Sequence, residues 1–209
     1  MIKIYLTSVA PFKSNALYKQ AYDSLSEERK EKADSLKSDL KKRQSVAAGW
    51  LLSYVCQEWE QEMNKEQEQE KEQEPEIESE LYTNLSHSGV YAACIVGDSA
   101  VGIDIEGVRT FRAGIVRKCF SASEQSLIEA AASAEERDEL FTRIWTRKES
   151  IAKLTKEGIA RIMRRRNLEE DASVYTKSFR IETSDGVYYM TAASYTKELP
   201  IEYDEVEYF

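Results

Sequence analysis

The sequence predicts an α+β protein composed of two similar α+β subdomains. The expected elements follow the same order twice: shorter helices, then a long helix, then a β-hairpin, the second hairpin being signalled by Asp185-Gly186. The first series of elements ends and the second begins near Glu106, although no residue-by-residue repeat is evident. We therefore expect an N-terminal subdomain over residues 1–106 and a C-terminal subdomain over residues 107–209.

The bulk composition argues against several classes of protein. A chain of 209 residues can bury a sizeable core, as one domain or as two small ones. No apolar run is long enough to span a bilayer, and the first residues read as a strand rather than a signal peptide. Cys56, Cys94 and Cys119 are widely spaced, with no Cys-x-x-Cys pair. This pattern indicates a cytoplasmic protein without a disulfide framework or a zinc site.

One segment carries the whole excess of negative charge. The formal net charge is −9, and residues 57–80 contain 11 glutamates and two lysines. The rest of the chain is therefore balanced. The segment has too few apolar side chains to offset its ordering entropy by packing. We interpret it as an insertion or linker that can prolong the preceding helix into solvent; a tail that docks a protein partner is the functional alternative.

Local signals place the N-terminal elements. Residues 1–9 alternate as in a strand, Pro11 interrupts them, and a helix is expected over 15–22. Ser26 is the expected N-cap of the next helix. A longer helix is expected to begin near Ser38. Its apolar stripe, which we interpret as core, consists of Val46, Ala47, Trp50, Leu51, Tyr54 and Val55.

Strands are then expected over 81–86, 90–96 and 100–106. Gly97 and Asp98 form the turn between the last two of them.

The C-terminal half begins with helices. One is expected near 112–119, and Ser121 and Ser133 each open another with capping-box spacing. The last of these helices is long and runs to about Thr155, and Gly158 is expected to end it. The remaining extended segments cover residues 173–182, 187–194 and 201–207.

The strand over 101–106 is acidic on one face. Side chains alternate along a strand, so the valine and the two isoleucines share one face and Gly102, Asp104 and Glu106 share the other. The two carboxylates repel each other unless a cation or a proton lies between them. Taken alone, the segment is most simply interpreted as a half-buried strand with a solvated acidic face.

The long C-terminal helix carries a second charged pair. Glu149 and Lys153 are four residues apart and therefore share a helix face. An ordinary surface ion pair is the simplest interpretation. Trp145 and Ala152 flank that face, however, so the pair is expected at the margin of an apolar surface.

Four motifs follow one another in a fixed order: Leu-Ser-His-Ser-Gly at 85–89, Val-Gly-Ile-Asp-Ile-Glu at 101–106, Phe-Ser with a following glutamate at 120–124, and Trp-Thr-Arg-Lys-Glu-Ser-Ile-Ala-Lys at 145–153. This series resembles the signature of the 4′-phosphopantetheinyl transferase superfamily, firmly over residues 81–160. The chain length is similar to that of the surfactin-type branch. The resemblance implies a pseudo-duplicated fold with the active site between the two subdomains.

The resemblance also implies a reaction. A serine hydroxyl of an apo acyl or peptidyl carrier protein attacks the β-phosphate of coenzyme A, phosphopantetheine is transferred, and 3′,5′-ADP leaves. In this family pattern Asp104, Glu106 and Glu149 are the ligands of Mg²⁺, a hard cation that prefers oxygen donors. Glu149, or a water that it orients, is the expected base for the serine proton. Lys153 is expected to act in catalysis and to neutralise phosphate oxygens, assisted by Lys148.

The family pattern assigns further contacts to coenzyme A. His87, the single histidine of the chain, and Ser86 occupy the motif positions that contact its phosphates. Arg43 is the candidate for the 3′-phosphate, although it can lie one position out of register, with Gln44 where arginine is expected. The Gly-Lys-Pro-type loop that family members carry before the Ser-His motif is absent, and the Glu/Gln/Lys segment stands in its place.

Two other functions remain open at this stage. A catalytically weakened family member could bind a carrier protein or coenzyme A without transferring the group. A nucleic-acid binder could use the basic run 161–166, but that run lacks interleaved aromatic residues and the rest of the chain is balanced in charge. We expect the transferase, acting as a monomer, with no nucleic-acid or membrane partner.

Overall fold

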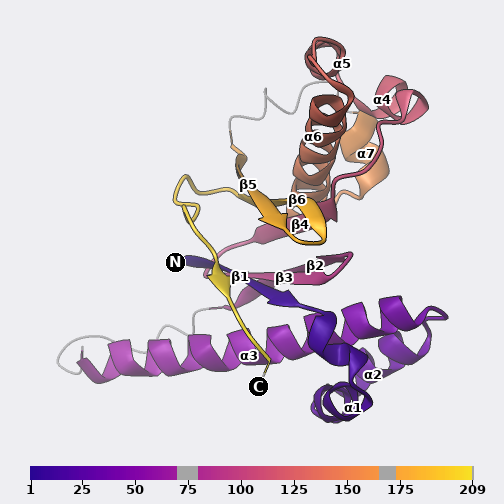
Figure 1. Cartoon of the computed structure of the whole chain (residues 1–209). Coiled ribbons are helices and arrows are strands. Elements are labelled where there is room, and N and C mark those ends of the chain that lie inside the picture. Colours follow the sequence, from indigo (N-terminus) through magenta and orange to yellow (C-terminus); the bar gives the residue numbers. More distant parts are fainter. Residues whose placement is uncertain (70–79, 165–172, 209) are drawn as a thin grey trace.

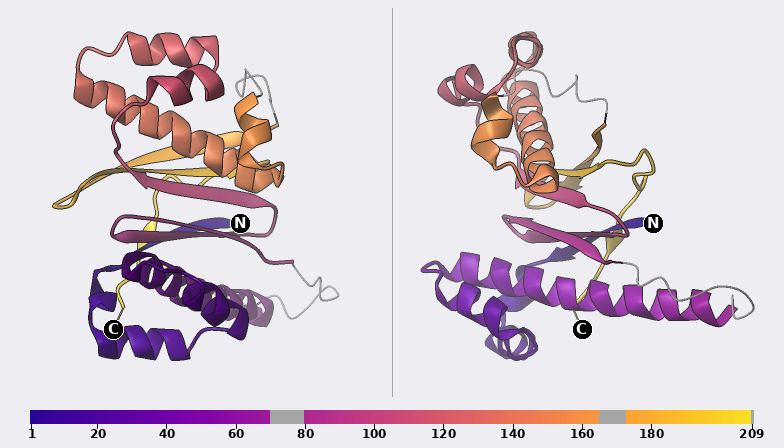
Figure 2. Two further views of the ribbon diagram at one scale, coloured as in Figure 1. Left: turned by 90° about the vertical axis from the view of Figure 1, so that its right-hand side faces the viewer. Right: turned by 180° about the vertical axis from the view of Figure 1, so that it is seen from behind.

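The computed structural model describes residues 1–69, 80–164 and 173–208, and these residues form four layers (Figure 1). Helices α1 to α3 form one outer layer, and a four-stranded sheet lies against α3. A three-stranded sheet follows, and helices α4 to α7 lie on its far side (Figure 2). The mixed α+β class that the sequence predicts is confirmed, while the duplicated origin of the two halves stays a prediction.

The N-terminal elements begin close to the expected positions. Their bounds are β1 Ile2–Ser8, η1 Ala10–Lys13, α1 Asn15–Asp23, α2 Glu27–Asp34 and α3 Asp39–Gln69. The predicted N-cap of α2 is confirmed, because the Ser26 hydroxyl accepts a hydrogen bond from the Arg29 amide.

Helix α3 extends well into the acidic segment. Trp59 is only 5 % exposed and packs with Leu51 and Val55 against the sheet, and Glu62 forms an ion pair with Lys3. Under the linker interpretation the segment prolongs the preceding helix, which it does as far as Gln69, but Trp59 and Glu62 contact the rest of the protein rather than solvent alone. The stretch 70–79 of the same interpretation lies outside the described residues.

The strands form two separate backbone-paired sheets. Their bounds are β2 Tyr82–Ser88, β3 Tyr91–Gly97, β4 Val101–Gly107, β5 Tyr175–Thr183, β6 Gly186–Ser194 and β7 Asp204–Glu205. The strand order is β2-β3-β1-β7 in the first sheet and β4-β6-β5 in the second. Among the strand pairs of the described residues, only β1–β7 is parallel. Of the extended segment expected over 201–207, only the two residues of β7 pair as a strand.

The C-terminal helices are α4 Ala113–Cys119, α5 Ala122–Glu129, α6 Ala134–Thr155 and α7 Ile159–Arg164. Ser121 forms the predicted capping box with Glu124, and the Ser133 hydroxyl accepts from the Glu136 amide at the start of α6. The predicted end of α6 near Thr155 is confirmed. The left-handed C-cap is Lys156, with φ 56°, rather than the predicted Gly158, which follows with φ 76°.

The largest apolar cluster lies between the two sheets. It combines alternate residues of β1 and β3 with alternate residues of β4, as the two-residue period of a strand requires. Its buried members are Ile4, Leu6, Ala93, Ile95, Val101, Ile103, Ile105, Ile181, Tyr188, Met190 and Ala192. The apolar face of the acidic strand is thus fixed inside the molecule.

The other face of β4 lies against α6. A Cβ atom at Gly102 would meet the Ser150 carbonyl oxygen and would lie 2.7 Å from the Leu154 amide nitrogen, so only glycine permits this approach. Asp104, two residues further on, is 3 % exposed. The expectation of a solvated acidic face is therefore wrong, because α6 covers it.

Among the described residues, no helix combines the length and the apolar character needed to cross a bilayer.

The burial of Trp59 predicts how far the core extends along α3. Trp59→Ala should lower the free energy of unfolding by about 3 kcal/mol, because a large buried side chain leaves a cavity. Glu60→Ala is the matched control: the neighbouring residue is exposed, and its loss should cost less than about 0.5 kcal/mol. Urea unfolding of both variants checks this, and equal effects would show that residue 59 lies outside the cooperative core.

Candidate active site

A cavity of about 260 Å³ lies where α2, α3, β2, β4 and α6 meet. The residues that line it are Arg29, Lys32, Ser45, Ala48, Leu85, Ser86, His87, Asp104, Glu106, Glu149 and Lys153. Larger cavities lie elsewhere in the described structure, at the N-terminal helices, beside β7, and between α5, α6 and β5. We take the smaller cavity as the candidate site because it gathers charged residues from motifs far apart in the sequence.

Six of the eight residues predicted from the sequence line this cavity; Arg43 and Lys148 do not. Arg43 lines a separate cavity of about 390 Å³ at the N-terminal helices. Lys148 is fully buried on another face of α6, with its ammonium 2.9 Å from a carboxylate oxygen of Glu124 and 5.5 Å from the centre of the Phe120 ring. In this geometry Lys148 holds α5 and α6 together and does not face the cavity.

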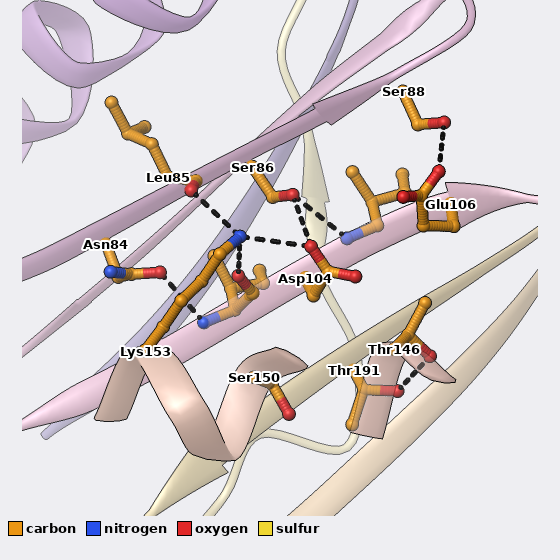
Figure 3. A network of polar contacts seen from close by, with 12 residues as sticks. Asn84, Leu85, Ser86, Ser88, Asp104, Glu106, Thr146, Ser150, Lys153 and Thr191 are labelled. Carbon is orange, nitrogen blue, oxygen red and sulfur yellow. Dashed lines mark hydrogen bonds and ion pairs between the residues drawn. The ribbon is translucent and has the colours of Figure 1, made fainter. Parts of the chain in front are cut away.

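Asp104 is held by one of its two carboxylate oxygens (Figure 3). Oδ1 accepts hydrogen bonds from the Ser86 hydroxyl at 2.8 Å and from the Lys153 ammonium at 3.0 Å. Oδ2 is buried and has no hydrogen-bond partner among the described residues. Burial raises the pKa of the Asp104 carboxyl above its ordinary value, although Lys153 and Ser86 favour the charged form.

The Lys153 ammonium reaches both strands at once. It donates to the backbone oxygen of Ile103 at 2.8 Å and to that of Leu85 at 3.3 Å, in addition to Asp104. An ammonium group has three hydrogens, and these three acceptors use all of them. Lys153 thus ties α6 to β2 and β4, and its charge lies at the floor of the cavity.

Glu106 is held by a hydroxyl and a guanidinium. Its Oε2 accepts from Ser88 at 2.8 Å, and its Oε1 forms an ion pair with Arg109. The Arg109 guanidinium also lies over the Trp145 ring, 5.6 Å from its centre. Arg109 lies two residues beyond the end of β4, and it was not predicted from the sequence as a site residue.

Glu149 lies half-buried on α6. Burial raises the pKa of its carboxyl, and repulsion from Asp104 and Glu106 raises it further, against the opposing effect of Lys153. The three acidic side chains therefore influence one another across one cavity.

The donor chemistry of this cavity fits a hard divalent cation. The Asp104, Glu106 and Glu149 carboxylates offer oxygen ligands, and the buried Oδ2 of Asp104 lacks a partner. Within residues 1–69, 80–164 and 173–208, however, no group of three such side chains is already gathered as a metal site. Binding would thus need the half-buried Glu149 and Glu106 side chains to turn toward Asp104.

The opposite wall of the cavity is cationic. Arg29 and Lys32 lie three residues apart on α2, so they share a helix face. Ser45 of α3 lies beside them; it is 2 % exposed, and its hydroxyl has no hydrogen-bond partner in the described structure. No role was predicted for these three residues from the sequence, although the helical spacing of Arg29 and Lys32 was a signal that could have linked two of them.

His87 lies at the end of β2, on the rim of the cavity. Desolvation of the ring lowers its pKa, and the ammonium groups of Lys32 and Lys153 lower it further, against the opposing effects of a backbone hydrogen bond and of Glu106, although the residue as a whole remains exposed. The surroundings of the ring therefore favour its uncharged form.

Comparison with known proteins shows a family similarity within the C-terminal half. Residues 100–200 match the sequence profile of the 4′-phosphopantetheinyl transferase superfamily. The predicted resemblance to this superfamily is confirmed. The matched residues include Asp104, Glu106, Glu149 and Lys153, whereas the phosphopantetheinyl transferase profile does not reach Ser86, His87 or the cationic wall.

Individual phosphopantetheinyl transferases show the same local similarity. The chain is 41 % identical over 78 residues to psf-1 of Bacillus pumilus, which covers 37 % of this chain and 33 % of that protein. It is 32 % identical over 77 residues to Sfp of Bacillus subtilis strain 168, covering 37 % and 34 %, and 42 % identical over 77 residues to AcpT of Escherichia coli K12, covering 35 % and 38 %. The similarity thus spans about a third of the length of these relatives.

The chain contains a single histidine, so its titration can be followed without ambiguity. We expect the imidazole signals of His87 to titrate with a midpoint below 6.5 in the free protein, because desolvation and two neighbouring ammonium groups disfavour the charged ring. Proton NMR between pH 4.5 and 8 measures this. A midpoint at or above 6.5 would show that the ring lies away from Lys32 and Lys153.

Proposed function

We propose that this chain transfers the 4′-phosphopantetheine group of coenzyme A to a serine of an apo acyl or peptidyl carrier protein and releases 3′,5′-ADP. One observation carries the proposal: the acidic residues of the family motifs and a cationic wall from the other half of the chain line the same cavity. A diphosphate substrate needs cations along its length and oxygen ligands for a metal ion at the reacting phosphate, and this cavity offers both.

The carboxylates are proposed to bind Mg²⁺. Asp104 would use its unpartnered Oδ2. Glu106 would turn its Oε1 toward the ion from Arg109 while Oε2 stays bonded to Ser88, and Glu149 would complete the set from α6. The ion, when bound, neutralises charge on the diphosphate and on the leaving group. The raised pKa values of Asp104 and Glu149 support this assignment, because closely spaced buried carboxylates favour a bound cation.

The proton of the attacking serine is proposed to move to Glu149 or to a water that Glu149 orients. The serine oxygen forms a bond to the β-phosphorus, and the bond from that phosphorus to the bridging oxygen breaks. The bridging oxygen leaves with 3′,5′-ADP. The raised pKa of the Glu149 carboxyl suits a base, since proton transfer is most effective when the pKa lies closer to the working pH.

The phosphates of coenzyme A are proposed to lie against the cationic wall. Arg29 and Lys32 supply charge, His87 lies at the rim, and the unpartnered Ser45 hydroxyl is available as a donor. This arrangement gives the 3′-phosphate partners despite the absent Gly-Lys-Pro loop, and it replaces Arg43, which lines another cavity. Lys153 is proposed to contribute its charge to catalysis through its position beside Asp104.

We extend the proposal to the organisation of the chain. Subdomains over 1–106 and 107–209, related by duplication, would place the reaction at their boundary, which agrees with the position of the cavity beside β4. A monomer in the cytoplasm, without nucleic-acid or membrane partners, completes the proposal. The widely spaced cysteines are consistent with the cytoplasm.

A second candidate is a binding protein that retains the cavity without efficient transfer. The observation that favours it is the pairing of Glu106 with Arg109 and of Asp104 with Lys153, which already offsets part of the negative charge. Such a protein would hold a carrier protein or coenzyme A.

One assay separates the two candidates. The protein is incubated with coenzyme A, MgCl₂ and a panel of apo carrier proteins, and the carriers are weighed by mass spectrometry. We expect a phosphopantetheine mass gain on at least one carrier. No mass gain is expected when EDTA is present during the incubation. If the carriers that bind the protein gain no mass at any Mg²⁺ concentration, the transferase proposal fails.

Substitution of the acidic residues should abolish transfer without unfolding the protein. Asp104→Ala and Glu149→Gln should each lower turnover by about two orders of magnitude or more, because each removes a metal ligand or the base. Far-UV circular dichroism is the control for folding. Near-normal turnover in either folded variant would contradict the assignment of that residue.

The cationic wall predicts selectivity for the 3′-phosphate. Arg29→Ala and Lys32→Ala should each raise KM for coenzyme A about tenfold, because each removes a charge-assisted hydrogen bond, while KM for 3′-dephospho-coenzyme A changes little. Lys30→Ala is the matched control, since Lys30 lies on the same helix but pairs with Glu27 outside the cavity. Equal losses on both substrates would place Arg29 and Lys32 at the diphosphate instead.

A further inference from the structure

Strands β2 and β4 lie side by side without a backbone ladder between them. In the described structure β2 pairs through its backbone with β3, and β4 pairs with β6. The edges of the two sheets are joined by side chains of β2, which accept hydrogen bonds from backbone amides of β4. The bonds of this β2–β4 seam run from the Ile103 amide to Asn84 at 3.1 Å, from the Ile105 amide to Ser86 at 3.2 Å and from the Gly107 amide to Ser88 at 3.2 Å.

The spacing of the seam follows from strand geometry. Alternate side chains of β2 point to the same face, and alternate backbone amides of β4 point to the same edge. Three side chains of β2 therefore meet three amides of β4 in register. Without these side chains the amides of β4 at this edge would lose their partners, and a buried amide without a partner is costly. The seam therefore fixes how the first sheet meets the second.

Two of the three seam residues do more than join the sheets. A serine hydroxyl has one hydrogen, and having accepted from β4 it can still donate that hydrogen. Ser86 donates to Oδ1 of Asp104 and Ser88 donates to Oε2 of Glu106, each at 2.8 Å. Asn84 accepts from the Ile103 amide and holds no carboxylate of the described residues.

We infer that Ser86 and Ser88 are positioning residues for the two carboxylates of β4. Each serine is fixed by a backbone amide of β4 and holds one oxygen of a carboxylate on the same strand. The Asp104 oxygen that Ser86 does not hold is the buried one without a partner. This role rests on the proposed function, since it orients the proposed metal ligands. It also changes the expected role of Ser86, whose side chain is nearly buried and is engaged with Ile105 and Asp104 rather than free for coenzyme A.

Asn84 is the matched control for the two serines, because it joins the sheets in the same way but holds neither Asp104 nor Glu106. Ser86→Ala, Ser88→Ala and Asn84→Ala each remove one bond between the sheets, but only the serine variants release a carboxylate. We expect all three to lower the melting temperature. With coenzyme A present, the serine variants should bind Mn²⁺ at least tenfold more weakly by isothermal titration calorimetry, while Asn84→Ala should bind it as the wild type does. A second readout is the Mg²⁺ concentration for half-maximal turnover, which should rise in the serine variants alone.

A pair of nearly isosteric variants guards against misfolding. Ser88→Thr keeps the hydroxyl and should bind Mn²⁺ like the wild type. Ser88→Val has a methyl group where threonine has the hydroxyl, and it should bind Mn²⁺ weakly. If Asn84→Ala weakens Mn²⁺ binding as much as the serine variants do, the serines act only through the seam and the inference is overturned. Unchanged Mn²⁺ affinity in Ser86→Ala and Ser88→Ala overturns it as well.

Failure of the proposed function has a different outcome. A wild type that binds Mn²⁺ with coenzyme A in a serine-dependent way, yet modifies no carrier protein, supports positioning and contradicts transfer. A wild type that transfers the group while the serine variants bind Mn²⁺ normally contradicts positioning alone. A wild type that does not bind Mn²⁺ at all overturns both.

Discussion

The close approach of α6 to β4 at Gly102 is the contact on which the rest of the site depends. Because residue 102 has no side chain, the backbone of α6 around Ser150 lies directly on the strand. This approach brings the Lys153 ammonium to 2.8 Å from the Ile103 oxygen and 3.0 Å from Asp104. Any larger residue at 102 would push the helix away and would carry Glu149 and Lys153 with it. The glycine of the motif is thus a requirement of packing, and the acidic residues beside it are placed by that packing.

The protein's own cations and hydrogen-bond donors neutralise the acidic side chains of the site only in part. Lys153 and Ser86 stabilise the charged form of Asp104, and Ser88 and Arg109 engage Glu106. Burial nevertheless raises the pKa values of the Asp104 and Glu149 carboxyls, so the protein's own cations and donors do not fully offset desolvation and repulsion. A divalent cation would supply the missing charge. The cationic wall on the other side of the cavity serves the opposite need, because a phosphate group requires charged or donor partners there.

Local signals in the sequence predicted the helices and strands well. The predictions that failed concern side chains whose position depends on how distant elements pack together. Capping serines, strand alternation and the Asp-Gly turn depend on neighbouring residues, so they could be recognised directly. The family resemblance predicted six residues that line the cavity. Periodicity by itself assigned only two pairs to shared faces, Asp104 with Glu106 and Glu149 with Lys153. Lys148 could not be placed in this way, since α6 packs on several sides and the pairing with Glu124 depends on where α5 folds back. No role was predicted for Arg29, Lys32 and Ser45, because only the packing of α2 on α3 and of α3 on β2 brings them to the acidic residues.

One measurement tests most directly whether the proposed metal ligands and the phosphate-binding residues form a single site. Mn²⁺ is paramagnetic and broadens the NMR signals of protons close to it, and His87 is the chain's only histidine. With coenzyme A and Mn²⁺ bound, we expect the His87 ring signals to broaden beyond detection in the wild type and to remain narrow in Asp104→Asn under the same conditions. Narrow His87 signals in the wild type at saturating Mn²⁺ and coenzyme A would contradict a single site at the junction of β2, β4 and α6.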